Sequence, residues 1–364
     1  MGTGLLSAQL LKRSYTVEAL GIDCNPLSAF VARTKLSWPQ VDPTKLRAMA
    51  SDILSQSDEE LHSLPVLSSI RTGRCISRYR SGQILTLRAN LEAAERSVER
   101  DVLLLGLASC IEPVSKVRRD GRALRIVTKA RVSLKKLLAD RWELMARDVE
   151  ALKASHPSPA GTSIWCGDGR KPAVVGVADS TIDLIVTSPP YPNNIDYNEV
   201  YKLELWLLGF ATSPENFLAL RRQTFRSHPT CSPAATEVDY ERDFSAILEN
   251  GPLENLLGIV ARRVKTLDSG RAKVLLGYLY DTWVTLQAHH RALRSGGQAI
   301  YVVGNSLHGS MTARPYLIPT DLIFSTLGKM LGYEVDDVLV ARSLSRRLSG
   351  NHFLRDSLVV LSKP

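Results

Sequence analysis

The stretch that most constrains the fold is IDLIVTSPPY, residues 182–191, in which a short apolar run ends in two adjacent prolines. The run is typical of a buried β-strand, since it is rich in isoleucine, leucine and valine. Pro189 and Pro190 stop such a strand, because proline has no backbone N–H to donate and its ring fixes φ. The sequence therefore predicts a core strand that ends in a rigid corner carrying Ser188 and Tyr191.

Strand-like and helix-like segments alternate along most of the chain. Residues 1–36 predict a loop, a helix, a strand and a second helix, and the pair Asn25 and Pro26 suits the start of that second helix. A long helical pattern at residues 274–297 precedes a strand pattern at residues 298–306, and a further helix and two strands follow. This order predicts an α/β fold with a mostly parallel sheet and helices on both faces.

Proline-rich stretches divide the sequence into parts. Residues 39–158 are rich in charge and show apolar residues at three- and four-residue spacing, as amphipathic helices do. We expect them to form a helical, basic insertion between an N-terminal part at residues 1–38 and the remainder of the same domain at residues 159–364. A polar loop is expected at residues 212–243.

The cysteines and the apolar runs exclude several classes of protein. The five cysteines form no C-x-x-C pair, so the sequence indicates neither a zinc site nor a disulfide framework, and a reducing cytoplasm suits it best. The longest apolar run, at residues 102–108, is far shorter than the roughly 20 residues that span a bilayer. We therefore expect a cytoplasmic protein with no membrane partner. His289 and His290 lack a ligand partner at a suitable spacing, so we expect them on a helix surface and predict no metal site.

Glycines at the start of the chain indicate a nucleoside-binding loop. Gly2 and Gly4 lie directly before a predicted helix, and Asp23 ends the next apolar strand. Glycine lets the backbone approach a ligand, and an acidic residue at that place accepts hydrogen bonds from ribose hydroxyls. The third glycine of the dinucleotide pattern is absent, because Ser7 stands there. A flexible turn followed by a helix cap is the alternative interpretation.

The corner at residues 188–191 suits a flat base that carries an amino group. It follows a strand, and ligands of open α/β sheets bind at the carboxyl ends of the strands. The carbonyls between Ser188 and Pro190 have no sheet partner, so an exocyclic amino group can donate to them. Tyr191 offers a flat face for stacking, which is worth roughly 1 to 3 kcal/mol per base. Loop stiffening, turn capping by Ser188 and core packing by Tyr191 are the alternative interpretations.

Taken together, TSPPY at 187–191, GTG at 2–4 and GID at 21–23 resemble motifs of the amino-group DNA methyltransferases. That family methylates N4 of cytosine or N6 of adenine with S-adenosylmethionine, and the serine form of its Pro-Pro-Tyr motif is commoner among the N4-cytosine enzymes. CGDG at 166–169 and LRSGGQAIYVVGNS at 293–306 extend the resemblance over most of the chain outside the insertion. It implies a Rossmann-like, S-adenosylmethionine-dependent methyltransferase sheet with a large helical insertion.

The resemblance also implies roles for individual residues in binding the cofactor. Gly2, Thr3 and Gly4 would contact its methionine and ribose region, and Asp23 would bind the ribose hydroxyls. Asp168 would receive the adenine amino group, with turn capping as the alternative.

The same resemblance implies a catalytic role for the corner. The target base, which such enzymes extract from the helix, would be held by Ser188, Pro189, Pro190 and Tyr191. Hydrogen bonds from its amino group to Ser188 and to the Pro189 carbonyl would favour a pyramidal nitrogen that attacks the sulfonium methyl in line.

Basic residues in two stretches predict contact with nucleic acid. The chain carries a formal net charge of +9, which points to a polyanionic partner. Between residues 116 and 136 the only acidic residue is Asp120, whereas a solvated helix face usually mixes signs. We expect DNA as the partner, with RNA, or an ordinary exposed surface, as the alternatives. The candidate contacts are Lys116, Arg118, Arg119, Arg122, Arg125, Arg221 and Arg222.

One feature of the family is missing from the sequence. The family carries a central strand directly before the glycine loop, whereas here Met1 precedes Gly2. A truncated product, a mis-assigned start and a split enzyme whose first strand comes from another chain are the competing explanations. We therefore expect the isolated chain to be a weak or inactive methyltransferase.

Three functions follow from these observations. The leading one is a site-specific DNA methyltransferase of an exocyclic amino group, cytosine N4 ahead of adenine N6, in restriction-modification or defence. An RNA methyltransferase acting on a guanine amino group, as in transfer RNA, is the nearest alternative enzyme. An inactive, truncated remnant that binds nucleic acid is the alternative from another class.

Overall fold

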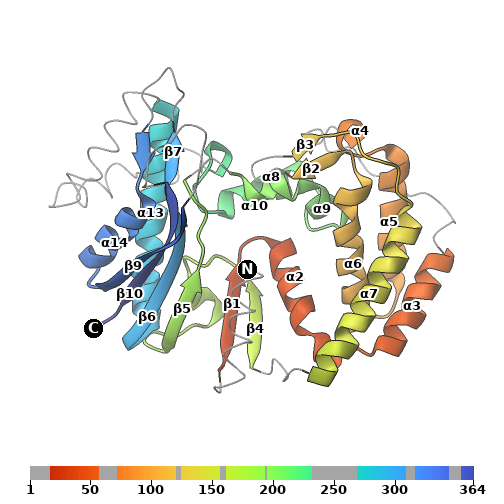
Figure 1. Ribbon diagram of the computed structural model, residues 1–364, viewed down its shortest axis with the longest axis horizontal. Helices are drawn as coiled ribbons and strands as arrows, with labels where there is room; N and C mark the ends of the chain where they lie inside the picture. Colours follow the sequence, from red (N-terminus) through yellow and green to blue (C-terminus); the bar gives the residue numbers. More distant parts are fainter. Residues whose placement is uncertain are drawn as a thin grey trace. The chain divides into compact units, whose positions relative to one another are not determined.

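The computed structural model describes residues 17–56, 72–119, 124–155, 161–192, 195–231, 269–308, 316–343 and 354–364. The chain divides into two compact units, whose elements are labelled in Figure 1. Unit 1 comprises Met1–Cys166 and Tyr197–Leu220, and unit 2 comprises Gly167–Asp196 and Arg221–Pro364. Unit 1 thus contains the expected insertion together with segments on either side of it, and the boundaries of the insertion stay a prediction.

Two parallel strands form one of the two-stranded sheets of unit 1, and the antiparallel pair β2 (Val117–Arg119) and β3 (Leu124–Ile126) forms another. β1 (Ala19–Asp23) pairs with β4 (Thr162–Cys166) along its whole length. α2 (Pro26–Leu36) follows β1 and packs against β4 through small alanine side chains. Its start confirms the prediction. The Asn25 side chain accepts hydrogen bonds from two first-turn N–H groups, and Pro26, which has no N–H, stands where a backbone N–H would have no acceptor within the helix.

Helices make up most of the rest of unit 1. Three of them begin at a polar cap, because the side chains of Asp42, Ser77 and Ser97 accept hydrogen bonds from first-turn N–H groups. Their apolar faces share one core, in which buried Trp142 donates its indole N–H to the Leu103 carbonyl at 2.8 Å. The elements after α2 are η1 (Trp38–Gln40), α3 (Pro43–Ser55), α4 (Thr72–Cys75), α5 (Arg78–Ala93), α6 (Val98–Val114), β2 (Val117–Arg119), β3 (Leu124–Ile126), α7 (Leu134–Ser155), α8 (Tyr197–Val200), α9 (Lys202–Leu207) and α10 (Pro214–Gln223), which begins in unit 1.

Four strands form the main sheet of unit 2, in the order β5-β6-β10-β9 (Figure 1). β5 and β6 run parallel, whereas β10 is antiparallel to both of its neighbours. The predicted parallel sheet therefore contains one reversed strand, because β10 follows β9 in the chain without a helical crossover pattern between them. The elements are η3 (Pro172–Val175), β5 (Ile182–Thr187), η4 (Pro229–Cys231), α13 (Ser269–Ala292), β6 (Leu293–Gly304), β7 (Ser306–His308), β8 (Tyr316–Ile318), α14 (Thr320–Met330), β9 (Glu334–Ser343) and β10 (Arg355–Ser362).

The helices α13 and α14 cover one face of this sheet. Their apolar side chains share a core with Tyr301 of β6 and Val359 of β10, which stand opposite each other in the strand register. Side chains alternate between the two faces of a strand, so Leu184 and Val186 of β5 point to the other face. Within the described residues these two side chains are 41% and 48% exposed. The part of unit 2 that the structure describes therefore buries one face of its sheet more fully than the other.

The α/β class predicted from the sequence is confirmed, although α13 and β6 both begin earlier than predicted, α13 at Ser269 rather than at residue 274. β6 begins at Leu293 rather than at residue 298, and α13 ends directly before it. Gly296 permits this early start because its φ of 74° lies in the left-handed region that favours glycine, at a shift in the pairing with β5.

Two further findings concern membranes and metals. None of the helices in the described part of the chain is both long and apolar enough to cross a membrane. Among the same residues, no three His, Cys, Asp or Glu side chains are grouped so that they could hold a metal ion.

Gly106 of α6 leaves the space that the Trp142 ring occupies. A Cβ on Gly106 would lie 2.4 Å from two atoms of the indole ring. We expect Gly106→Ala to lower the free energy of unfolding by about 1 to 3 kcal/mol, because an added methyl group displaces a buried ring from a packed core. Urea denaturation followed by tryptophan fluorescence measures the change. Gly169→Ala is the control, since a Cβ there would meet no atom within 4 Å; equal losses in both variants would contradict the packing.

Candidate active site

The Asp168 loop lies at the start of unit 2 and is held by its own arginine. The Asp168 carboxylate accepts hydrogen bonds from the backbone N–H of Arg170 at 3.0 Å and from its Nε at 2.9 Å. The Asp168 side chain nevertheless keeps 25% of its surface exposed. Asp168 is therefore fixed in place and still accessible to a ligand that donates a hydrogen bond.

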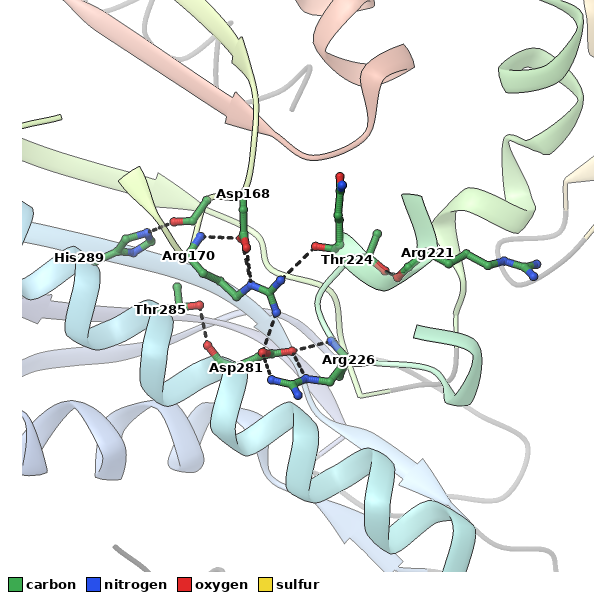
Figure 2. A network of polar contacts seen from close by, with 10 residues as sticks. Asp168, Arg170, Arg221, Thr224, Arg226, Asp281, Thr285 and His289 are labelled. Atoms are coloured by element: carbon green, nitrogen blue, oxygen red, sulfur yellow. Dashed lines mark hydrogen bonds and ion pairs between the residues drawn. The ribbon is translucent and has the colours of Figure 1, made fainter. Parts of the chain in front are cut away.

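One buried carboxylate, that of Asp281 on α13, holds two arginines (Figure 2). Arg170 donates from Nη1 at 2.6 Å, and Arg226 donates from its backbone N–H and its Nε, each at 2.8 Å. Burial alone would lower the pKa of Arg170, but the charges of Asp281 and Asp168 outweigh it and raise that pKa. Because Arg170 Nη2 also donates to the Gln223 carbonyl at 3.0 Å, Asp281 joins the Asp168 loop and the segment after α10 to one helix.

His289 attaches α13 to the same loop a second time. Its Nε2 lies 3.2 Å from the Gly169 carbonyl and its Nδ1 lies 2.8 Å from the Tyr301 hydroxyl. Burial lowers the pKa of His289 to about 4, so the ring is neutral at pH 7. A carbonyl only accepts, so Nε2 carries the proton and Nδ1 accepts from Tyr301. His289 is half-buried on α13 rather than freely exposed, because the Gly169 loop and β6 pack against it.

The corner at residues 188–191 begins where β5 ends, as the sequence predicts. Ser188 Oγ donates to the Val302 carbonyl of β6 at 3.1 Å, which anchors the corner to the neighbouring strand. Pro189 is buried beneath it, whereas Ser188 is exposed. A hydroxyl oxygen has two acceptor positions, and the hydrogen bond with Tyr191 uses at most one of them, so Ser188 can accept a further hydrogen bond while its proton is engaged by Val302.

Tyr191 lies against Gly304 at the end of β6. A Cβ on Gly304 would stand 2.7 Å from the Cδ2 and Cε2 atoms of the tyrosine ring, so only glycine leaves room for it. Burial raises the pKa of the Tyr191 phenol, a hydrogen bond with Ser188 opposes this, and the charge of Asp356 adds to it. The packing therefore places an uncharged aromatic ring beside the exposed Ser188 hydroxyl.

Asp23 ends β1 in unit 1, at the place that the sequence predicts. Its Oδ1 accepts the backbone N–H of Asn25 at 2.8 Å, which shapes the turn into α2. Burial raises the pKa of Asp23, and the hydrogen bond from Asn25 offsets only part of that rise. The other predicted cofactor residues of this unit, Gly2, Thr3 and Gly4, lie outside the described residues.

Three of the predicted nucleic-acid contacts form an exposed basic edge on the β2–β3 pair. Arg118 of β2 stands directly opposite Arg125 of β3, and both are exposed. Lys116, which precedes β2, is exposed as well. Arg122 lies outside the described residues.

Arg119, from the same stretch, is held within unit 1. It forms an ion pair with Glu112 at 2.5 Å and a second one with Glu204 of α9, which is buried. Its guanidinium also lies over the ring of Tyr201, 4.8 Å from the centroid. These contacts describe a structural arginine, since three neighbouring groups already engage it.

Arg221 and Arg222 occupy the last turn of α10, where basic residues suit the negative end of a helix. Arg221 forms an ion pair with buried Asp196 at 2.9 Å, whereas Arg222 is exposed. The structure differs here from the expected polar loop at residues 212–243, because α10 takes up much of its first part. The portion of that loop after residue 231 lies outside the described residues.

Curated relatives of the chain are methyltransferases. The chain is 24% identical over 300 residues to the type II methyltransferase M.AvaI of Nostoc sp. (strain PCC 7120), covering 74% of this chain and 60% of that protein. It is 22% identical over 234 residues to the type II methyltransferase M.BsoBI of Geobacillus stearothermophilus, covering 57% of this chain and 45% of that protein. The matches thus span 60% or less of each relative's length, and no protein-family model matches. These relatives confirm the resemblance that the motifs indicate.

A weaker likeness exists among solved structures. TTHA0409 of Thermus thermophilus, proposed to be a DNA modification methylase and solved with S-adenosyl-L-methionine, is 13% identical, with 54% of either chain covered. Its TM-score is 0.27, so the superposition carries no argument. The roles of the candidate residues stay predictions.

Asp281→Asn leaves Arg170 and Arg226 without the anion they share. We expect it to lower the free energy of unfolding by about 3 to 5 kcal/mol, since removing one partner of a buried ion pair leaves the other charge uncompensated. Urea denaturation measures the loss. The matched control is Asp183→Asn. Asp183 pairs with Arg294 on the surface, where their side chains are 69% and 62% exposed, respectively. The expected loss of unfolding free energy for this variant is below about 1 kcal/mol. Similar losses in the two variants would contradict the role of Asp281.

His289 makes the folded state sensitive to acid. Its pKa of about 4 lies below the ordinary value of 6.5, so between these values the unfolded chain binds a proton that the folded chain does not. Stability from this residue is therefore lost as the pH falls from about 6.5 to about 4. We expect His289→Gln to lose less unfolding free energy between about pH 7 and pH 5 than the parent chain. Denaturant titrations at both pH values test this, and equal losses would exclude it.

Proposed function

We propose that this chain, as a homologue of the type II methyltransferases, transfers a methyl group from S-adenosylmethionine to an exocyclic amino group of a base in DNA. The observation that carries the proposal is the corner after β5, where the exposed Ser188 hydroxyl, the Pro189 carbonyl and the Tyr191 ring lie together in the chain. The serine in this motif favours cytosine N4 over adenine N6. The type II relatives support a restriction-modification setting. A cytoplasmic location remains part of the proposal.

Two carboxylates of the chain suit the nucleoside part of the cofactor. In the part of the chain that the structure describes, Asp23 engages only its Oδ1, so its second oxygen is left to accept from ribose hydroxyls. Asp168 can accept an adenine amino group beside Arg170, because a carboxylate offers about four acceptor positions. When bound, S-adenosylmethionine supplies an electrophilic methyl group on a sulfonium sulfur.

The chain's own task is to make an aromatic amine reactive, because its lone pair is delocalised into the ring. Ser188 Oγ and the Pro189 carbonyl accept hydrogen bonds from the amino group and favour a pyramidal nitrogen, while Tyr191 holds the base by stacking. With S-adenosylmethionine bound, the nitrogen would take its methyl group, and the electron pair of the broken carbon–sulfur bond would stay on sulfur. The positively charged nitrogen would then lose a proton to water. Positioning and electrostatics supply the catalysis.

The arginines on the β2–β3 pair support DNA as the partner. Arg118 and Arg125 stand directly opposite each other on paired strands, and both are exposed. A backbone phosphate that contacts both guanidiniums would release counterions from the DNA. Lys116 and Arg222, which are exposed, extend the surface available to phosphates.

Tyr191→Ala tests the corner directly. We expect it to slow transfer of tritiated methyl groups to duplex DNA roughly 10- to 100-fold, because stacking on an aromatic ring contributes roughly 1 to 3 kcal/mol per base. Ser188→Ala should also slow transfer, since it removes an acceptor for the amino group. Ser295→Ala, which removes an exposed hydroxyl that donates to the Pro364 carbonyl, is the matched control and should leave the rate unchanged.

The same assay separates the alternatives. Methyl transfer to transfer RNA but not to DNA would identify an RNA methyltransferase. DNA binding in a gel-shift experiment, without methyl transfer either by the parent chain or by a version extended upstream of Met1, would identify an inactive remnant. Nucleoside mass spectrometry of the methylated DNA decides between cytosine N4 and adenine N6.

A further inference from the structure

A row of three residues crosses the sheet of unit 2 next to Tyr191. Asp356 of β10 stands directly opposite Gly304 of β6 on one side and Arg342 of β9 on the other. Directly opposite residues share a face of the sheet, so the Asp356 side chain lies between the glycine and the arginine. Because Gly304 has no side chain, the Tyr191 ring occupies the space beside Asp356.

The distances place the carboxylate close to the tyrosine ring. A Cβ on Gly304 would stand 2.7 Å from Asp356 Oδ1 and also 2.7 Å from the Cδ2 and Cε2 atoms of Tyr191. The oxygen and these ring carbons are therefore separated by at most twice that distance. The charge of Asp356 also raises the pKa of Tyr191, whereas that of Arg342 lowers it.

The two oxygens of Asp356 have different surroundings. Oδ2 accepts from Arg342 Nε at 2.7 Å, on a side chain that is 70% exposed. Oδ1 is buried and has no hydrogen-bond partner in the part of the chain that the structure describes, although Asp356 as a whole is 7% exposed. Buried carboxylate oxygens ordinarily have donors. Asp321 nearby shows the usual arrangement, since it accepts from Arg355 Nε and Ser357 Oγ, each at 2.9 Å.

A negative charge at this place favours a positive charge near the tyrosine ring. The face of an aromatic ring attracts cations, and an anion beside the ring strengthens that attraction in a partly buried site. Methyl transfer to an amino group creates such a cation at the nitrogen. An interaction that is stronger with the charged nitrogen than with the neutral amine accelerates the reaction rather than only binding the substrate.

We propose that Asp356 is a positioning residue for methyl transfer, which sets the place and the electrostatic character of the Tyr191 ring so that the site favours a cationic base over a neutral one. This assignment rests on the proposed function, because it supposes that a base stacks on Tyr191. Asp356 acts through Tyr191 and through its charge, and Arg342 moderates that charge from the solvent side.

The first measurement follows Tyr191 in the free protein. Replacing the tyrosines with 3-fluorotyrosine makes the phenols more acidic and visible by fluorine NMR, and the Tyr191→Phe variant assigns the signal. Asp356→Asn should lower the pKa of residue 191, and Arg342→Gln should raise it. Asp336→Asn, which neutralises a carboxylate elsewhere on β9, should leave it unchanged. Opposite shifts from the first two variants are not expected from a general loosening of the fold.

The second measurement tests the preference for a cation. The probes are cytidine and N3-methylcytidine, which is a cation near pH 7, each titrated against the fluorine signal of residue 191. The parent chain should bind the cation about 10-fold more tightly than the neutral nucleoside, and Asp356→Asn should bring the two affinities close together. A preference that survives in Asp356→Asn, or a signal that responds to neither nucleoside, overturns the assignment.

Kinetics complete the test on duplex DNA. Asp356→Asn should lower kcat about 10-fold with little change in KM, since the positive charge exists in the transition state and not in the bound substrate. A loss confined to KM would contradict the assignment. The two proposals can fail separately. If the parent chain transfers no methyl group, but its preference for the cationic nucleoside is lost in Asp356→Asn, the proposed function is wrong and the role of Asp356 toward the base is supported.

Discussion

The Asp281 side chain on α13 is a buried carboxylate, with 1% of the residue's surface exposed. Burying a charge is unfavourable unless cations and hydrogen-bond donors replace the water that would surround it. Arg170 and Arg226 supply the positive charges and the donors, and each of them lies in a segment outside α13. The carboxylate therefore determines where the Asp168 loop lies against α13, with His289 adding a second attachment through the Gly169 carbonyl. Any ligand that Asp168 receives is bound by a loop whose position depends on this one ion-pair network (Figure 2).

The corner after β5 depends on a different constraint, which is the absence of a side chain at Gly304. Without that space the Tyr191 ring could not lie against the end of β6, and Asp356 could not approach it. The two prolines alone make the corner stiff, but they do not place its aromatic ring. Three strands thus contribute to the arrangement around Tyr191: β5 leads into the corner, β6 supplies Val302 and Gly304, and β10 supplies the carboxylate.

Much of the fold was predictable because its signals act over a few residues. The helix start at Asn25, the strand that stops before Pro189 and the final pair of strands all follow from local rules of capping, proline geometry and apolar pattern. The arginines were harder, because composition does not reveal partners. Arg119 belongs to the same basic stretch as Arg118, yet it is engaged by Glu112 and Glu204, the latter 85 positions away.

By itself the sequence determined the order of strands and helices, the rigid corner and the residues that resemble a methyltransferase, since each depends on neighbours in the chain. Only the tertiary structure decided which charges are buried and what they face. Asp281 meets Arg170 across 111 positions, and Asp356 meets the ring of Tyr191 across a glycine on another strand. A carboxylate's surroundings are set by whichever distant segments pack against it, and no local pattern specifies those segments.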